Sequence, residues 1–232
     1  MQGSALRRRQ LREVHVSDDP ETLRQMEELS HDDRPLLVLD VDDVLLDFIE
    51  PFPRYLQGRG FKLNLENFRL NGNIVDMATG SLAEAAKVDE LIDDFFVSQG
   101  EWQALTRGAA DALAFIGDRA EIILLTAMPH RHRAARIAHL ESLGFAYPLL
   151  TTEMAKGPAI ERLRGPSMRP VAFVDDQPRN LVSAMERVPD AHLFHLMADN
   201  SLRALIPAPP PGVRVVDDWQ EAAPKIAEAL GL

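Results

Sequence analysis

Residues 35–44 read PLLVLDVDDV, an apolar run that opens with a proline and ends in clustered carboxylates. A continuous apolar run of this kind is typical of a β-strand that is buried on both faces of a parallel sheet. Asp40, Asp42 and Asp43 end this stretch, and carboxylates in such a cluster repel one another and lose hydration. A divalent cation would offset that cost, and oxygen ligands of this type suit Mg²⁺.

A second strand repeats the pattern. Residues 170–176 read PVAFVDD, again an apolar run that ends in two carboxylates, Asp175 and Asp176. Taken singly, each cluster could be a capped turn with solvated loop residues. Neighbouring parallel strands, however, place their carboxyl ends at one edge of the sheet, where ligands bind in folds of this class. We therefore expect the two acidic clusters to meet.

The rest of the chain alternates between strand patterns and helix patterns. Further strands are expected at 121–126, 148–151, 191–196 and 213–216, and helices at 102–118, 130–144, 178–188 and 217–230. Alternation at these lengths predicts an α/β fold, with a Rossmann-like parallel sheet and helices on both faces.

One stretch interrupts this alternation. Residues 46–100 are far longer than a single crossover helix requires, and they contain helical patterns, with 83–100 the clearest. We expect a small, mostly helical cap inserted after the first strand into a core domain of residues 35–232. Residues 1–34 form a polar N-terminal extension, with one helix that starts from Asp19 as its N-cap.

Composition narrows the functional classes. The 232 residues carry 36 acidic and 25 Lys or Arg side chains, a net charge of −11, which argues against a nucleic-acid polymer as partner. The absence of cysteine excludes disulfides, thiolate metal sites and cysteine nucleophiles. The apolar runs are too short to cross a bilayer, and no apolar stretch follows the basic N-terminus as in a secretory signal. We expect a cytoplasmic protein with no membrane partner.

The order of these motifs resembles one family. DVDDV at 40–44 is similar to the DxDx[TV] signature of the haloacid dehalogenase superfamily of phosphotransferases. A strand that ends in Thr126, a downstream Lys156 and the segment FVDDQPRN at 173–180 follow in the family's order. The resemblance extends from about residue 35 to residue 195, which is most of the chain.

The resemblance implies roles for the carboxylates. Asp40 would be the nucleophile that forms an aspartyl-phosphate, and Asp42 would be the general acid and base. Crowding by other carboxylates would help Asp42 to keep its proton. Mg²⁺ would be held by the Asp40 carboxylate, the Asp42 backbone carbonyl and Asp175, with Asp176 helping directly or through water.

It also implies roles for three further residues. Thr126 and Lys156 would bind the phosphate, and Asn180 would orient the acidic pair from behind. On their own, these residues could equally be a strand threonine, a surface lysine and a helix-start asparagine. We expect Arg179 to face solvent and Asp43 to be a turn residue.

Other polar residues have weaker signals. His130 and His132 lie in a basic helix start without the spacing of a zinc site, so we expect them on a solvated surface. The predicted cap carries four basic residues that could meet a charged substrate group but are more typical of plain surface: Arg54, Arg59, Lys62 and Arg69.

The function that these features imply is a Mg²⁺-dependent phosphomonoester hydrolase that acts through an aspartyl-phosphate. Its substrate would be a small soluble phosphate ester, such as a phosphorylated metabolite or a nucleotide. Two alternatives stay open: a non-catalytic regulatory or scaffold protein on this fold, and a phosphomutase. A dehalogenase is disfavoured because that chemistry needs neither a second aspartate nor a metal. The sequence specifies neither the substrate nor an oligomeric state.

Overall fold

The computed structural model describes residues 18–30, 32–65 and 69–232. A six-stranded sheet lies at its centre, with strand order β5-β4-β1-β6-β7-β8 and parallel pairing throughout. The strands are β1 (Leu36–Leu39), β4 (Glu121–Thr126), β5 (Leu149–Thr151), β6 (Val171–Asp175), β7 (His192–His195) and β8 (Arg214–Val215). The predicted α/β fold with a Rossmann-like parallel sheet is confirmed.

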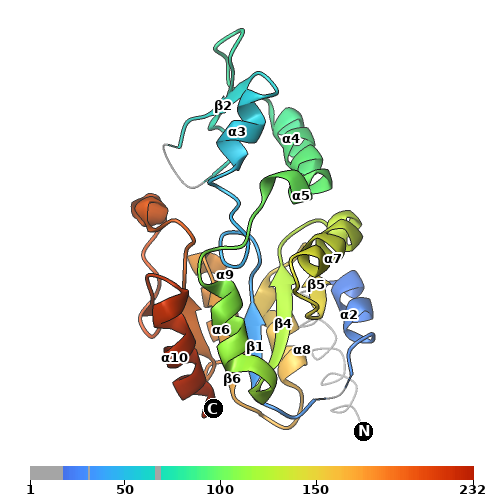
Figure 1. Cartoon of the computed structure of the whole chain (residues 1–232), viewed down its shortest axis with the longest axis vertical. Coiled ribbons are helices and arrows are strands. Elements are labelled where there is room, and N and C mark those ends of the chain that lie inside the picture. Colours follow the sequence, from blue (N-terminus) through green and yellow to red (C-terminus); the bar gives the residue numbers. More distant parts are fainter. Residues whose placement is uncertain (1–17, 31, 66–68) are drawn as a thin grey trace, which may run out of the picture.

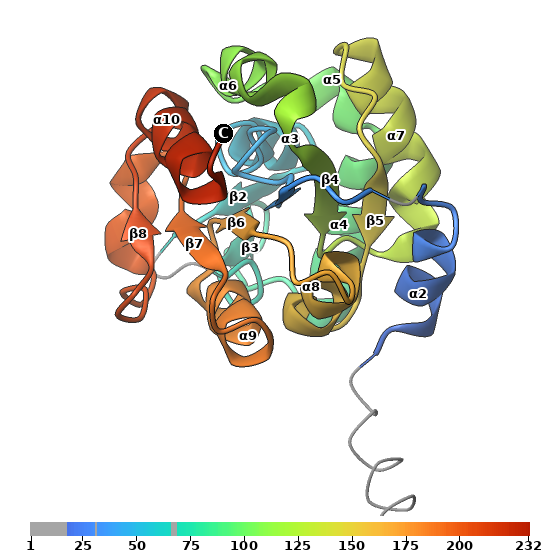
Figure 2. The ribbon, with the colours of Figure 1, turned by 90° about the horizontal axis from the view of Figure 1, so that it is seen from below.

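Alternate residues of β1 point to opposite faces of the sheet, and each face is covered by helices (Figure 2). Leu37 and Leu39 pack in one apolar cluster, and Leu36 and Val38 pack in the other. The first face is covered by α6 (Ala109–Ile116), α7 (Arg133–Ser142) and α10 (Trp219–Leu230), and the second by α8 (Lys156–Arg164) and α9 (Pro178–Arg187). Because both faces are covered, the central strands are apolar between their end residues, with polar Glu121, Thr126 and Asp175 only at the ends of β4 and β6.

The helix predicted in the N-terminal extension is α2 (Pro20–Met26), and Asp19 is its N-cap as expected. It packs against β5 at one edge of the sheet (Figure 2). Thr151 of β5 donates its N–H to Gln25 Oε1 (2.8 Å), and its carbonyl accepts from Thr22 Oγ1 (2.7 Å). Side chains of α2 therefore satisfy backbone groups of β5 that a further strand would otherwise pair with.

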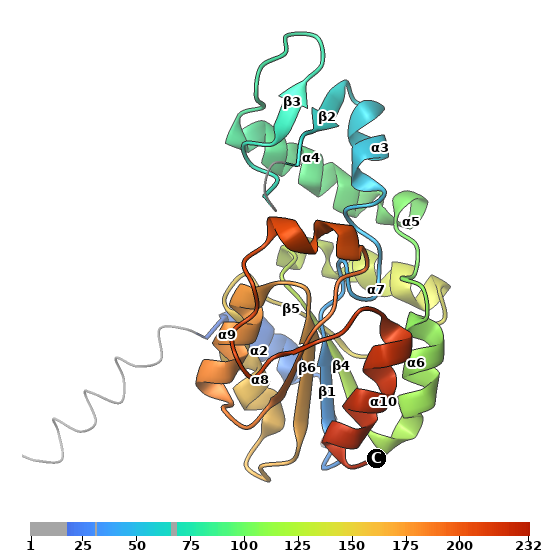
Figure 3. The ribbon, with the colours of Figure 1, turned by 90° about the vertical axis from the view of Figure 1, so that its left-hand side faces the viewer.

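The segment between β1 and β4 contains a separate lobe beyond the carboxyl ends of the strands (Figures 1 and 3). It contains α3 (Phe52–Gln57), β2 (Phe61–Leu63), β3 (Ile74–Asp76), α4 (Ala85–Val97) and α5 (Gln99–Trp102). The helices pack on an aromatic cluster that includes Phe48, Phe52, Tyr55 and Phe95. β2 and β3 form an antiparallel pair, which the sequence analysis did not anticipate.

The helix predicted over 102–118 is shorter than expected. α6 begins at Ala109, after Gly108 in the left-handed region (φ 85°). Residues 103–106 instead run beside residues 45–47, the other connection to the lobe. Two backbone hydrogen bonds of 2.9 Å join them, from Asp47 to Ala104 and from Thr106 to Leu45. We call these two paired segments, 45–47 and 103–106, the neck.

Three 3-10 helices complete the described chain: Gly117–Arg119, His130–His132 and Asn200–Leu205. The last of these reaches the lobe, where Leu202 packs against its aromatic cluster (Figure 3). Among the described residues, none of the helices combines the length and the apolar character that crossing a bilayer would require.

Candidate active site

The two acidic clusters meet at the carboxyl ends of β1 and β6. Carboxylate oxygens of Asp40, Asp175 and Asp176 lie within 4.8 Å of one another, and all three residues are buried. β1 and β6 are paired neighbours in register, so Asp40 and Asp175 follow equivalent positions of the two strands. Thr126, at the end of β4 on the other side of β1, is buried beside them.

Asp40 has one oxygen held and one oxygen available. Its Oδ1 accepts the backbone N–H of Val41 (2.7 Å) and lies 2.8 Å from Lys156 Nζ. Among the described residues, Oδ2 has no hydrogen-bond donor assigned to it. Burial raises the pKa of Asp40 to about 7, although the ammonium of Lys156 opposes the rise. The held oxygen fixes the carboxyl group and leaves Oδ2 as a candidate nucleophile.

Lys156 and Asn180 both bind Asp175. Lys156 Nζ lies 2.7 Å from Asp175 Oδ2, and Asn180 Nδ2 lies 3.0 and 3.1 Å from its two oxygens. Burial would lower the pKa of Lys156, but Asp175 and Asp40 outweigh it and raise that pKa above its ordinary value. Lys156 thus bridges the carboxylates of the two strands, and Asn180 orients the second one.

The position of Lys156 depends on a close approach of two helices. The next residue, Gly157, lies so near α9 that an added Cβ would be 2.1 Å from the backbone oxygen of Ser183. The N–H of Gly157 also donates to Ser183 Oγ (3.0 Å). Only glycine permits this contact, which brings α8 with Lys156 against α9 with Asn180.

Asp176 is the carboxylate whose charge is not compensated. Among the described residues, Asp176 accepts a hydrogen bond from the side-chain amide of Gln177 and is not paired with any cation. Burial, and then repulsion from Asp175 and Asp40, raises the pKa of Asp176 well above its ordinary value. The ammonium of Lys156 is paired with Asp40 and Asp175, so one cation faces a group of three buried carboxylates. An oxygen-only donor set with this excess of negative charge fits a divalent cation.

Asp42 is held by two residues that the sequence motifs do not indicate, Arg136 and Gln103. Its Oδ1 accepts from Arg136 Nη2 (2.9 Å) and from Gln103 Nε2 (2.8 Å). Its Oδ2 lies 3.4 Å from Thr126 Oγ1. We expected other carboxylates to be the decisive neighbours of Asp42, whereas its direct contacts are these donors. Arg136 lies one helical turn before Leu140 on the buried side of α7, but this spacing does not indicate a contact with Asp42.

Asp43 is a turn residue, as expected, but it is buried rather than solvated. It has a left-handed backbone (φ 57°), and its Oδ1 accepts the N–H groups of Phe48 (2.9 Å) and Ile49 (3.0 Å). Burial raises the pKa of Asp43 to about 7. The side chain therefore ties the loop after β1 to the start of the lobe.

The expectation of a solvated surface is wrong for His132. This residue is buried, and its Nε2 lies 2.9 Å from Asp93 of α4, to which Arg131 also binds. His130 is largely buried as well, and it bridges Asp19 (3.0 Å) and Thr151 (2.7 Å). The basic helix start thus contacts both the lobe and the N-terminal extension.

The four basic residues of the lobe differ from one another. All are exposed, and Arg59 stacks on the ring of Tyr55 at 3.8 Å. Of the four, Arg69 alone lines the cavity above the carboxylates. Arg179, expected to face solvent, is exposed but lines the same cavity.

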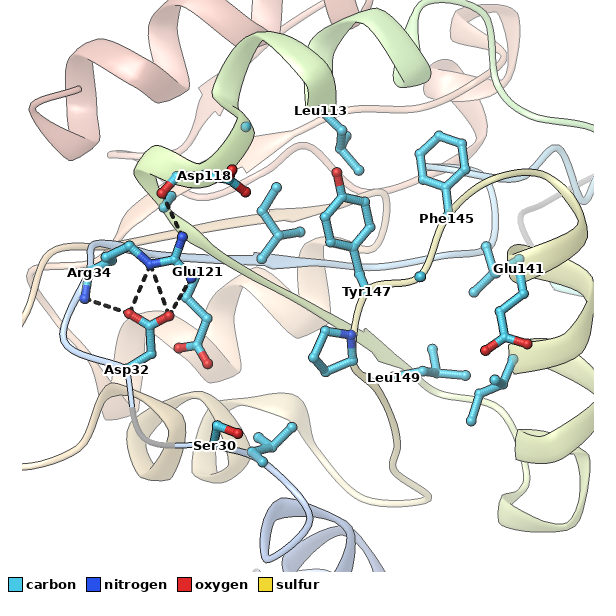
Figure 4. Close-up of a pocket in the computed structure, with 18 of the residues that line it drawn as sticks. Ser30, Asp32, Arg34, Leu113, Asp118, Glu121, Glu141, Phe145, Tyr147 and Leu149 are labelled. Atoms are coloured by element: carbon cyan, nitrogen blue, oxygen red, sulfur yellow. Dashed lines mark hydrogen bonds and ion pairs between the residues drawn. The ribbon is translucent and has the colours of Figure 1, made fainter.

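That cavity has a volume of about 570 Å³ and lies between the strand ends and the lobe. A second cavity, of about 600 Å³, lies at the amino ends of the strands (Figure 4). There Arg34 binds Asp32 and the main-chain oxygen of Asp118. The acidic cluster of β1 and β6 is at the opposite end of the sheet, so we place the candidate active site in the first cavity.

No protein-family model and no curated protein matches this chain, but many solved structures share its fold. A haloacid dehalogenase-like hydrolase from Xanthomonas campestris has a TM-score of 0.53 at 15% identity, over 87% of this chain and 98% of that chain. A HAD family hydrolase from Deinococcus radiodurans R1, with bound phosphate and sodium, has a TM-score of 0.57 at 14% identity, covering 85% and 96%. CbbY from Rhodobacter sphaeroides, in complex with phosphate, has a TM-score of 0.55 at 15% identity, covering 86% and 100%. The chain therefore has the fold of haloacid dehalogenase-like proteins, as its motifs implied.

Proposed function

We propose that this protein is a haloacid dehalogenase-type phosphomonoester hydrolase that depends on Mg²⁺ and forms an aspartyl-phosphate on Asp40. Its substrate would be a small soluble phosphate ester. The observation that carries the proposal is that Asp40, whose Oδ2 accepts no hydrogen bond from the described residues, lines a cavity beside a cluster of buried carboxylates bridged by Lys156. We further propose that residues 46–100 act as a cap over a core of residues 35–232.

The cation would be held by Asp40 and Asp176, which both line the cavity, with Asp175 completing the group behind them. Both oxygens of Asp175 already accept hydrogen bonds from Lys156 and Asn180. When bound, the cation would screen the repulsion between the Asp40 carboxylate and the anionic phosphate.

The protein's own residues can supply the two half-reactions. Asp40 Oδ2 attacks phosphorus, the ester P–O bond breaks, and the leaving oxygen takes a proton from Asp42. A water molecule then attacks the aspartyl-phosphate, Asp42 takes its proton, and phosphate leaves with Asp40 restored.

Two other groups support these steps. Arg136 and Gln103 bind Asp42 Oδ1, so Oδ2, whose described contact is the longer one from Thr126 Oγ1 (3.4 Å), would carry the transferred proton. Thr126 can donate to a phosphoryl oxygen, and Lys156 fixes the nucleophile and offsets its charge.

The test is phosphate release from p-nitrophenyl phosphate by the purified protein with Mg²⁺, with EDTA added in parallel. We expect turnover with Mg²⁺, loss of turnover with EDTA, and loss of at least about a thousandfold in kcat for Asp40→Asn, because the nucleophile is removed. Asp118→Asn is the matched control, since Asp118 is an exposed carboxylate at the opposite end of the sheet.

The outcomes separate the alternatives. If the Asp40→Asn variant retained turnover, Asp40 could not be the nucleophile. A wild type that is silent across a panel of phosphate esters, yet binds a protein, would favour the scaffold function. Phosphate that passes to a sugar hydroxyl in preference to water would favour a phosphomutase.

A further inference from the structure

The cavity above Asp40 is much larger than a phosphate group requires, and its far wall is apolar. On the side of the lobe, six of the eight lining residues are apolar, and the polar ones are Arg69 and Asn71; the apolar six are Phe48, Ile49, Leu65, Leu70, Ile92 and Phe96. A bound phosphate would lie at the opposite, acidic end. The part of the substrate that contacts the six apolar side chains is expected to be apolar, because a polar group against them would lose its hydration without gaining a hydrogen bond.

Two arginines stand at the rim of this cavity. Arg69 comes from the lobe and Arg179 from the first turn of α9, and both also line an adjoining cavity of about 490 Å³. Within the described part of the chain, neither guanidinium is paired with a carboxylate or donates a hydrogen bond. In a protein with a net charge of −11, two unpaired arginines at one rim make a local site for an anion.

We propose that the substrate is a phosphate monoester with an apolar, ring-sized or alkyl body and a second anionic group, which Arg69 and Arg179 bind. The proposal rests on the proposed function and specifies its substrate class. The phosphate lies at the carboxylates and the body lies against the lobe. The second anion lies between an arginine of the lobe and an arginine of the core, so that its binding draws the two together.

The test compares 4-carboxyphenyl phosphate with its neutral counterpart, 4-carbamoylphenyl phosphate. Both are measured as kcat/KM with the wild type, Arg69→Gln, Arg179→Gln and the double variant. Because intrinsic leaving-group reactivity is the same for every variant, the ratio of the two substrates isolates recognition of the second anion. We expect this ratio to fall about tenfold or more in the double variant.

Arg54→Gln is the matched control, because Arg54 is an exposed arginine of the lobe that does not line the cavity and lies 3.8 Å from Glu50. It should leave the ratio unchanged. An unchanged ratio in the double variant, with turnover of both esters, overturns this inference and leaves the proposed function intact. Failure of the wild type to release phosphate from any ester overturns the function itself.

A third substrate, the bisphosphate of hydroquinone, identifies the anion. If the double substitution reduces its kcat/KM more than that of the carboxylate, the arginines bind a second phosphate. The reverse order assigns them to a carboxylate, and either result supports a second anionic subsite.

The apolar body is tested with phenyl phosphate against 2-hydroxyethyl phosphate. Replacing Ile92 by Asn should lower the preference for the phenyl ester, and an unchanged preference would remove the apolar wall from the proposal.

Discussion

Arg136 lies wholly inside the protein, yet its hydrogen bonds all come from one guanidinium nitrogen, Nη2. Among the described residues, its Nε and Nη1 have no hydrogen-bond partner. A buried arginine that loses so much hydration for so few bonds is poorly explained by stability alone. Its contact with Asp42 gives it a positioning role instead.

We therefore expect Arg136→Met to reduce kcat by about tenfold to a hundredfold, within the range of general acid–base catalysis, with KM changed less. The side chain of Asp42 is 21% exposed and can regain water, so the fold should survive. Arg133→Met is the control on the same helix, since Arg133 binds Glu28 and not Asp42. Steady-state kinetics and urea unfolding measure both effects. Equal losses of kcat in the two variants would contradict the positioning role.

His139 makes stability depend on pH. Burial, and then the charge of Arg136, lowers its pKa below the ordinary value of 6.5, although its hydrogen bond to the carbonyl of Gln103 opposes this. As pH falls through 6.5, the unfolded chain takes up a proton before the folded protein does, so the free energy of unfolding decreases. His139→Gln removes this proton uptake. We expect its free energy of unfolding, from urea titrations between pH 7.5 and 5.5, to fall less than that of the wild type.

At the scale of elements, the contact between α8 and α9 depends on Gly157. Gly157→Ala places a methyl group where the backbone of Ser183 lies, and overpacking of this kind costs about 3 kcal/mol. Gly100→Ala is the control: its Cβ would meet His139 at an ordinary 3.5 Å. Urea unfolding should show a large loss for the first variant and a change within about 1 kcal/mol for the second. If the Gly157→Ala and Gly100→Ala variants had similar free energies of unfolding, α8 and α9 would be able to move apart at little cost in free energy.

The attachment of α2 is testable through Gln25. In Gln25→Ala the N–H of Thr151 loses its acceptor in a buried place, which costs about 1–3 kcal/mol. Gln57→Ala changes an exposed glutamine in α3 and should have little effect. Chemical denaturation measures both. If the two variants were equally stable, α2 would contribute little to the sheet edge.

The sequence shows β1, β4 and β6 clearly because strands covered on both faces must be apolar along their length. It also shows where α7 ends, since Gly144 takes the left-handed conformation that only glycine adopts freely. The β2–β3 pair is not predictable in this way. Its strands have only three residues each, β3 is mostly buried while β2 is partly exposed, and their pairing depends on contacts within the lobe.

The same distinction applies to the site. The positions of Asp40 and Asp175 follow from strand ends, which sequence periodicity marks. Arg136 and Gln103 act through contacts between α7, the neck and the loop after β1, and no local pattern encodes such contacts. Residues 103–106 of the neck lie within a stretch whose spacing predicts a helix, and their pairing with residues 45–47 overrides that preference.

For the whole molecule, the excess of buried negative charge predicts a response to Mg²⁺. Binding to the folded state alone raises the melting temperature with metal concentration. We expect Mg²⁺ to raise the melting temperature of the wild type, and Asp176→Asn to lose most of that rise because the uncompensated carboxylate is removed. Asp118→Asn should respond like the wild type. Differential scanning fluorimetry without substrate measures this independently of activity, and an equal rise in all three proteins would place the metal elsewhere.

The neck has a mechanical consequence. The two connections that enter the lobe are hydrogen-bonded to each other, so a movement of the lobe about the neck would carry both connections together. Gln103 is part of the neck, and its side-chain amide also donates a hydrogen bond to Asp42, the proposed general acid and base. A rotation of the lobe that widens the cavity entrance would thus displace the Asp42 side chain. Closure of the lobe over a substrate would return Asp42 to its position. Admission of the ester and readiness for proton transfer would then be governed by a single hinge.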